Sequence, residues 1–362
     1  MDVAIVGLPL SGKTTLFAAL AAGHGSAAAA ARGEHIGAVK VPDERLLKLA
    51  GLVRAKKTTP IEVLLHDLPP LFERGAAPSG AAAESLAKAE ALIHVVRAFE
   101  RDDVPHSEGG IDPRRDIAAL DAELMLNDLG IIERRLEKLD ITVRSARPGE
   151  REAGEREKAL LDRCKGLLEA ERPLRDEISD RQDVKGLSNY GFLSLKPMLI
   201  VVNIGEAHAG AVPDIESEYG RATTDGGTRS GVAAICARLE AELAELSPEE
   251  ALEFRREMGA EAGAAERLLG RLMSLLGLIT FFTAGDKETR AWALPAGSTA
   301  LQAAGRVHTD IERGFIRAEV IAWDKLLEFG SHTEARKHGQ LRTEGKQYIV
   351  QDGDVINVLF NV

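Results

Sequence analysis

The 362-residue sequence predicts an α/β protein in which a parallel-rich sheet is interrupted by an antiparallel helical hairpin and followed by a small β-rich domain. Three features predict this fold class. Short apolar runs alternate with helix-like stretches in residues 1–113 and 196–276, a heptad pattern occupies 114–195, and short β-type runs fill 277–362. The length is sufficient for two or three domains, each with its own core.

Charge and cysteine content exclude several classes of protein. The 46 basic and 57 acidic residues give a net charge of −11, which argues against a broad electropositive face and against DNA as a partner. Cys164 and Cys236 lie outside any C-x-x-C spacing, so neither a disulfide framework nor a zinc site is expected. The first residues, MDVAIVGLPLSGK, contain no cationic leader and no apolar run of membrane length, and we expect a cytoplasmic protein without membrane contact.

The first apolar run, residues 3–6, is followed by GLPLSGKT, which matches the phosphate-loop pattern G-x-x-x-x-G-K-[ST]. In such a loop backbone N–H groups surround an anion, Lys13 reaches the β- and γ-phosphates, and the Thr14 hydroxyl ligates magnesium. A chance match in a glycine-rich turn is the alternative, and the position between a strand and a helix disfavours it. The predicted nucleotide-binding residues of this loop are Pro9, Leu10, Ser11, Gly12, Lys13, Thr14 and Thr15, with Lys13 as the catalytic residue.

Further strands are predicted at 61–65, 91–96, 198–202 and 232–235, and ligands bind at the carboxyl ends of such parallel strands. Asp67 follows the first of these runs, in VLLHDLPPLF. It is predicted to bind magnesium together with Thr14; the alternative is an ordinary turn aspartate before proline.

The ends of the last two strands predict a base pocket. In VVNIGE, Asn203 is placed to orient the loop and hydrogen-bond the base. Glu206 occupies the position where guanine-specific proteins have an aspartate after N-K-x, but it is longer and the lysine is absent, so ATP is predicted in preference to GTP. Cys236 and Ala237 follow the last strand and are predicted to contribute backbone groups to the pocket.

Several segments closely resemble the YchF, or Obg-like ATPase, family of translation-factor-class P-loop proteins, in order over nearly the whole chain. They are GLPLSGKTTLF, HVVRAFERDDVPHSEGGIDPRRDI, VVNIGE, CARLEAEL and LLGLITFFTAGDKETRAWALPAGSTALQAAGRVHTDIERGFIRAEVI. The resemblance implies an OBG-type G domain in 1–113 and 196–276, a coiled-coil hairpin in 114–195 and a ubiquitin-like TGS domain of β-grasp fold in 277–362. It also implies a preference for ATP and association with ribosomes. Gly7, Gly12, Lys13 and Thr14 match the family's phosphate loop, and Asn203 and Glu206 match its N-x-x-E motif.

The chain departs from the family pattern in its switch regions. Family members read D-I-A-G-L-V after the second strand, whereas here Pro70 replaces the glycine whose N–H meets the γ-phosphate, and proline has no N–H. Residues 16–57 contain no threonine. Ser26 is their only hydroxyl side chain and lies in an alanine-rich stretch that is expected to form a short helix or flexible loop without a ligand role. Ser85 aligns with the family's water-positioning histidine, so no catalytic base is assigned.

A heptad pattern predicts the hairpin. Apolar or small residues recur at Ala122, Met125, Leu129, Ile132, Leu136, Leu139 and Val143, and the pattern returns at Leu160, Cys164 and Leu167 after a break at 147–150. Basic residues surround the predicted tip: Arg134, Arg135, Lys138, Arg144, Arg147 and Arg151. They are either a solvated surface balanced by glutamates or a contact with ribosomal RNA.

Three smaller features complete the predictions. Asp352 and Gly353 form a favourable tight-hairpin signal between two β-rich stretches. His308 and Asp310 are expected to be structural or partner-contacting, because no nucleophile or metal cluster accompanies them. His94, in an apolar strand, is expected to be a core histidine with satisfied hydrogen bonds.

These observations predict a magnesium-dependent nucleotide-binding protein that hydrolyses ATP slowly and contacts the ribosome or ribosomal RNA through the hairpin and the TGS domain. The alternative is an adaptor in which nucleotide occupancy stabilises the fold with little or no hydrolysis. A phosphate-loop kinase is a weaker third interpretation, because no acceptor site or lid is evident.

Overall fold

The computed structural model describes residues 1–29, 35–69, 71, 80–101, 103–105, 110–145, 147–223, 229–258 and 263–361. The chain divides into two compact units. The first contains Met1–Val39 and Leu64–Arg271, and the second contains Lys40–Val63 and Leu272–Val362. None of the described helices is long and apolar enough to cross a membrane.

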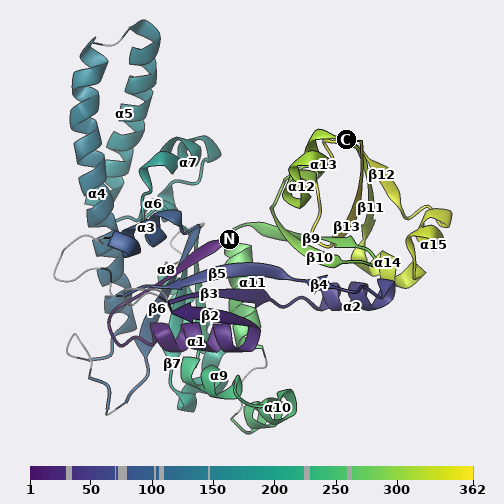
Figure 1. Ribbon diagram of the computed structural model, residues 1–362. Helices are drawn as coiled ribbons and strands as arrows, with labels where there is room; N and C mark the ends of the chain where they lie inside the picture. The colour runs from purple at the N-terminus through teal and green to yellow at the C-terminus, as the bar shows by residue number, and fades with distance from the viewer. Residues whose placement is uncertain are drawn as a thin grey trace. The chain divides into compact units, whose positions relative to one another are not determined.

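The first unit is built on a seven-stranded sheet of order β2-β3-β5-β1-β6-β7-β8 (Figure 1). Its strands are β1 (Asp2–Val6), β2 (Gly25–Ala29), β3 (His35–Val41), β5 (Ile61–Asp67), β6 (Ala91–Ala98), β7 (Met198–Ile204) and β8 (Ser230–Ile235). Strands β5, β1, β6, β7 and β8 pair in parallel, which confirms the predicted α/β class and its parallel-rich sheet. Because parallel strands share one direction, their carboxyl ends lie at one edge of the sheet.

Part of the alanine-rich stretch forms a strand, so the prediction of a short helix or flexible loop is wrong for these residues. Gly25–Ala29 forms strand β2, which pairs antiparallel with β3 from Gly25↔Val39 to Ala29↔His35. Alanine favours helices by propensity, but pairing along a sheet edge supplies backbone hydrogen bonds that override such a weak preference.

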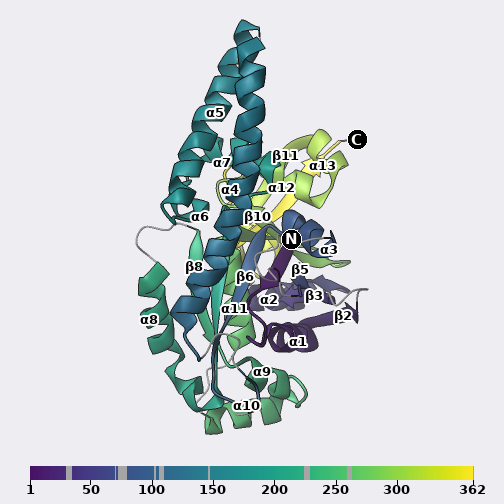
Figure 2. The ribbon, with the colours of Figure 1, turned by 90° about the vertical axis from the view of Figure 1, so that its left-hand side faces the viewer.

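Helices surround this sheet. They are α1 (Lys13–His24), α3 (Gly80–Lys88), α8 (Val212–Thr223), α9 (Ala237–Leu243), α10 (Pro248–Glu257) and α11 (Ala264–Leu275), with the 3-10 helix η2 (Glu206–Ala211). Figures 1 and 2 show α1 and α9 side by side. The core between sheet and helices is aliphatic, as the low aromatic content requires, and includes Val6, Leu92, Val96, Ile200 and Leu124.

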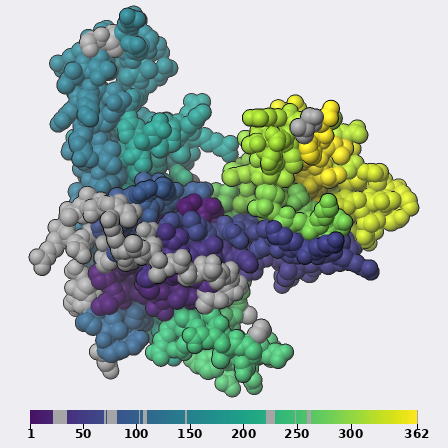
Figure 3. Space-filling view, in the orientation of Figure 1, coloured from purple at the N-terminus to yellow at the C-terminus, as the bar shows by residue number. Residues whose placement is uncertain are grey.

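The predicted hairpin is present as α4 (Pro113–Ser145) and α5 (Pro148–Glu169), followed by α6 (Leu174–Glu177), α7 (Arg181–Leu187) and η1 (Ser188–Tyr190). The two long helices pack along each other, with their side chains filling the space between them (Figures 1 and 3). On α4 the predicted positions Met125, Ile132 and Leu139 are buried. On α5 the predicted Cys164 is buried, and the predicted Leu160 and Leu167 are partly buried and pack against the same core, in which Leu161 and Leu168 are fully enclosed.

The second unit contains a six-stranded sheet of order β12-β11-β13-β9-β10-β4. Its strands are β4 (Thr58–Thr59), β9 (Leu278–Ala284), β10 (Thr289–Pro295), β11 (Phe315–Ala322), β12 (Arg342–Glu344) and β13 (Asp354–Phe360), and its helices are α2 (Glu44–Val53), α12 (Ala300–Val307), α13 (Thr309–Arg313), α14 (Trp323–Phe329) and α15 (His332–Lys337). The small buried face of α12, Ala300, Ala303 and Ala304, packs with Phe281 and Leu294 of the sheet.

The predicted tight hairpin at Asp352 and Gly353 is only partly correct. The turn exists, with Gly353 at φ +86° and its N–H bonded to the Thr280 carbonyl. However, the preceding residues form only an isolated bridge between Ile349 and Thr299, and β13 pairs with β11 and β9 instead. The turn therefore redirects the chain into the sheet rather than joining two paired strands.

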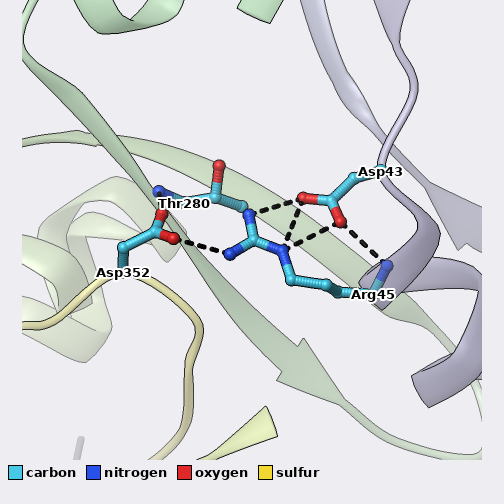
Figure 4. A network of polar contacts seen from close by, with 4 residues as sticks. All are labelled: Asp43, Arg45, Thr280 and Asp352. Atoms are coloured by element: carbon cyan, nitrogen blue, oxygen red, sulfur yellow. Dashed lines mark hydrogen bonds and ion pairs between the residues drawn. The ribbon is translucent and has the colours of Figure 1, made fainter. Parts of the chain in front are cut away.

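One part of the expected domain boundary differs in the structure. Residues 1–113 were predicted to begin the nucleotide domain, yet Lys40–Val63 belongs to the second unit. Figure 4 shows the physical reason. Arg45 of α2 bonds Asp352 through Nη1 (2.6 Å) and Asp43 through Nε (3.0 Å), while Asp352 accepts the Thr280 N–H (2.8 Å). The hydrogen bonds with Asp43 and Asp352 raise the pKa of Arg45 above its ordinary value.

We expect Arg45→Ala to lower the free energy of unfolding of the second unit by about 2 kcal/mol, because it removes charge-assisted hydrogen bonds from a half-buried guanidinium. Urea unfolding, with hydrogen exchange at the Thr280 amide, measures the change. Lys48→Ala on the same helix is the control, since the contact of Lys48 with Glu44 is an exposed ion pair. Equal stabilities of the two variants would contradict the expectation.

Candidate nucleotide site

The loop after β1 has the backbone geometry of an anion cradle. Gly7 (φ +148°), Leu10 (φ +62°) and Gly12 (φ +95°) all adopt positive φ, which turns successive N–H groups to one side. Leu10 is the only member that is not glycine, and its side chain is half exposed (51%). A leucine in this region of φ stores strain of the kind that is common in functional loops.

Gly7 and Gly12 are required for two reasons: their positive φ, and the lack of room for a side chain at either position. A Cβ on Gly7 would lie 2.4 Å from the Val95 carbonyl oxygen, and a Cβ on Gly12 would lie 2.2 Å from Asn203 Nδ2. The loop is therefore packed directly against β6 and β7, which explains the spacing of the two glycines in the sequence motif.

Lys13 begins α1 and points back over the loop. Its ammonium donates to the carbonyls of Gly7 (2.9 Å) and Leu8 (3.0 Å), and only 8% of the residue is exposed. Burial lowers the pKa of Lys13, and the negative charge of Asp67 opposes this shift. A phosphate bound in the loop would accept the hydrogen bonds of the Lys13 ammonium in place of these two carbonyls. Because the ammonium is already buried, this exchange would not require a further loss of its water.

Thr14 and Asp67, the two predicted magnesium ligands, are in direct contact. The Thr14 hydroxyl donates to Asp67 Oδ2 (2.8 Å), which leaves the hydroxyl lone pairs available to a cation. Within the described part of the chain, Asp67 Oδ1 and Ser11 Oγ are buried and have no hydrogen-bond partner. A buried acceptor without a donor is costly, and a magnesium ion with its water shell would satisfy it.

The protein ligands alone do not form a complete metal cage. Among the described residues no cluster of three or more histidine, cysteine, aspartate or glutamate side chains could bind a metal ion. Magnesium usually takes only one or two protein ligands and completes its shell with water and phosphate oxygens. The pair of Thr14 and Asp67 therefore fits magnesium that arrives with a nucleotide.

Asn203, at the end of β7, joins the loop to the strand-end segment after β8. Its Nδ2 donates to the Ser11 carbonyl (2.9 Å) and its Oδ1 accepts the Ala237 N–H (3.1 Å), with the side chain buried. Asn203 thus contacts the loop, and its predicted roles toward the loop and the base of a nucleotide stay predictions. Cys236 and Ala237 are also buried here, and burial raises the pKa of the Cys236 thiol.

Glu206, three residues after Asn203, is partly exposed, and its carboxylate lies near a cationic side chain. Its Oε1 lies 3.5 Å from Nε of Arg238, which also bonds Glu242 (2.8 Å). A carboxylate with a neighbouring guanidinium is a weaker acceptor for the N–H groups of a guanine, because part of its charge is already compensated. The sequence places Arg238 directly after Cys236 and Ala237 but does not predict that it pairs with Glu206.

Arg97 and Phe99 are two residues of this region that sequence reasoning missed. The buried guanidinium of Arg97 donates to the carbonyls of Phe99 (3.1 Å), Val104 (2.9 Å) and Pro105 (3.0 Å), and it lies over the Phe99 ring at 4.7 Å. Phe99 is next to both Gly12 and Gly205. The sequence feature that could have indicated Arg97 is a charged residue near the carboxyl end of a mostly apolar strand, since a buried arginine requires partners.

Comparison with known proteins identifies the family. The ribosome-binding ATPase YchF of Haemophilus ducreyi is 38% identical over 364 residues, covering 99% of this chain and 98% of that protein. The chain belongs to the YchF family. The protein of the same name from Bacillus subtilis is 36% identical over 368 residues, with full coverage of both chains.

The fold and the C-terminal region agree with this assignment. The solved structure of the Schizosaccharomyces pombe YchF GTPase superposes with a TM-score of 0.86 at 26% identity, covering 99% of this chain and 97% of that one. The family model YchF-GTPase_C, described as "Protein of unknown function (DUF933)", matches residues 278–361. The resemblance inferred from the motifs is therefore confirmed over the whole chain.

Some residues that distinguish this chain from the YchF pattern lie outside what the structure describes. Pro70 and the side chain of Ser26 are among them, so the predicted loss of the γ-phosphate contact stays a prediction. Pro9 is exposed in the loop, Thr15 is partly buried in the first turn of α1, and Ser85 is buried on α3.

Two histidines can be compared with their expected roles in this YchF protein. His308 caps α13 by accepting the Asp310 N–H at Nδ1 (3.1 Å), which is a structural role. His94 was expected to be satisfied, and this is wrong: it is fully buried, and neither ring nitrogen has a partner among the described residues. Burial lowers the pKa of His94 to about 3, and the charges of Arg175 and Lys13 act in the same direction.

The shifted pKa of His94 predicts a pH dependence of stability. An unfolded histidine titrates near 6.5 and the folded one near 3, so the neutral ring favours folding above pH 6.5 and stability is lost as the pH falls. The loss is at most about 1.4 kcal/mol per pH unit. Urea unfolding between pH 7 and pH 5 should show a smaller slope for His94→Leu than for the wild type. A His208→Leu control at an exposed site should keep the wild-type slope, and equal slopes for all three would contradict the expectation.

Proposed function

We propose that this YchF protein binds ATP with magnesium, in preference to GTP, hydrolyses it slowly and acts in contact with the ribosome. The observation that carries the nucleotide part is the convergence of Lys13, Thr14 and Asp67, with the Thr14 hydroxyl 2.8 Å from the Asp67 carboxylate and Asp67 Oδ1 buried without a partner among the described residues. The curated relatives are named ribosome-binding ATPases, which supports the same function.

In the proposed reaction, water attacks the γ-phosphorus and the bond to the β–γ bridging oxygen breaks, releasing phosphate and ADP. Magnesium bound with the nucleotide would neutralise charge on the phosphates. Lys13 would exchange its two carbonyl acceptors for phosphate oxygens and stabilise the charge that develops in the transition state. Thr14 and Asp67 would orient the metal, and the amides of the loop would fix the phosphate chain.

Slow turnover is expected from the composition of the switches. Pro70 has no N–H to offer the γ-phosphate, residues 16–57 contain no threonine, and no residue is assigned to position the attacking water. The preference for adenine is supported by the pairing of Glu206 with Arg238, which competes with bidentate recognition of guanine.

Phosphate release with magnesium and ATP tests the proposed activity. We expect measurable turnover by the full-length protein and a decrease of at least about 100-fold in Lys13→Ala, because a preorganised charge at the transferred phosphoryl group is lost. The same assay with GTP should give a lower kcat/KM. Wild-type turnover equal to that of Lys13→Ala would exclude hydrolysis and favour the adaptor alternative, in which nucleotide is bound without being cleaved.

Ribosome contact is proposed for the tip of the hairpin. Arg134, Lys138, Arg144, Arg147 and Arg151 are exposed and make no ion pair within the described part of the chain. Arg135 differs, because it is bound to Glu157 (2.6 Å). Unpaired arginines and lysines at the end of a projecting helical pair are suited to phosphate groups of RNA.

Charge reversal at the tip tests this contact. Arg144→Glu combined with Arg147→Glu should weaken co-sedimentation with ribosomes in low salt by about tenfold or more, because two phosphate-neutralising charges are replaced by repulsive ones. The matched control is Arg181→Glu combined with Lys185→Glu on α7, which makes the same change in net charge at exposed sites. Equal binding by the two double variants would assign ribosome contact to another surface.

A further inference from the structure

His35 contacts the same carboxylate that Thr14 contacts. His35 is the first residue of β3, and its Nδ1 lies 3.3 Å from Asp67 Oδ2, the oxygen that also accepts the Thr14 hydroxyl at 2.8 Å. An ionised carboxylate can only accept hydrogen bonds, so Nδ1 carries the hydrogen and donates it. The three side chains come from α1, β3 and β5 and meet at one oxygen atom.

The position of the imidazole is defined by its surroundings. Strand β3 lies next to β5 in the sheet, and the ring of Phe17 on α1 is 6.1 Å from the His35 ring, tilted by 36°. The Asp67 side chain is 4% exposed and the His35 side chain is 41% exposed. The Asp67 carboxylate is therefore nearly enclosed, while part of the His35 ring is open to solvent.

We propose that His35 is a positioning residue of the magnesium site, which orients Asp67 through its Nδ1–H. This inference rests on the proposed magnesium-dependent nucleotide binding. Donors that bind a metal-ligating group from outside fix its rotamer and raise its affinity for the metal. With Oδ2 engaged by Thr14 and His35, Oδ1 is the carboxylate oxygen left for the hydrated cation, and it is the atom that has no partner among the described residues.

This role matters in a chain whose first switch lacks threonine. Residues 16–57 contain no threonine, so the carboxylate and the Thr14 hydroxyl are the protein groups predicted to bind the metal. A site with few protein ligands depends strongly on the orientation of each one. His35 supplies that orientation from a neighbouring strand without being a ligand itself.

Manganese binding to the full-length protein tests the proposal without relying on turnover. Electron paramagnetic resonance would measure Mn²⁺ affinity of protein saturated with a non-hydrolysable ATP analogue. We expect His35→Ala to weaken Mn²⁺ binding by about tenfold. The affinity for the analogue in the absence of metal should be unchanged, which a purely structural defect would not produce.

Two conservative variants identify the atom involved. An asparagine amide N–H can occupy the place of Nδ1, and a glutamine amide can occupy the place of Nε2. We expect His35→Asn to restore most of the metal affinity and His35→Gln to restore little. The reverse order would overturn the proposed donation from Nδ1 to Asp67. Lys40→Ala, an exposed position on the same strand, is the control for nonspecific effects on β3.

Asp67→Asn separates this proposal from the function on which it rests. If Asp67→Asn weakens Mn²⁺ binding while His35→Ala leaves it unchanged, the role of His35 is overturned and the metal site stands. If the wild type, Asp67→Asn and Thr14→Ala all bind Mn²⁺ equally, the proposed magnesium site itself fails. Circular dichroism melts confirm that each variant is folded.

Discussion

The hydrogen bond from Thr14 to Asp67 is the interaction on which the candidate site depends. It joins the first turn of α1 to the carboxyl end of β5, and the two residues are 53 positions apart in the sequence. The parallel pairing of β1 with β5 places both ends at the same edge, so the loop and the aspartate can meet. The lysine, the cradle and the neighbouring His35 are arranged around this contact.

A second framework of buried polar groups supports the loop from the other side. Asn203 donates to the Ser11 carbonyl and accepts the Ala237 N–H, and the Arg97 guanidinium donates to three carbonyls of the segment after β6. Buried polar side chains of this kind are stable only when their hydrogen bonds are satisfied, and satisfied networks favour a single arrangement. The result is a loop held by β6, β7 and the turn after β8 before any nucleotide arrives.

The chain leaves the first unit and returns to it between two strands of the first sheet. The chain passes from the first unit to the second within β3 and returns within β5, and these strands carry His35 and Asp67 at their other ends. Between them, α2 is fixed to the second unit by Arg45 and Asp352 (Figure 4). Helix α2, which lies in the sequence between two strands of the seven-stranded sheet, is thus part of the second unit.

The sequence by itself determined the family, the α/β class, the phosphate loop and the heptad of α4, because glycines, a lysine and regular apolar spacing report local geometry directly. Only the tertiary structure decided that Gly25–Ala29 is a strand, that α2 belongs to the second unit, and that His94 is buried without partners among the described residues. It also brought His35 to Asp67 and Arg238 to Glu206. These facts depend on contacts between residues far apart in the chain, for which neither propensity nor spacing carries a signal.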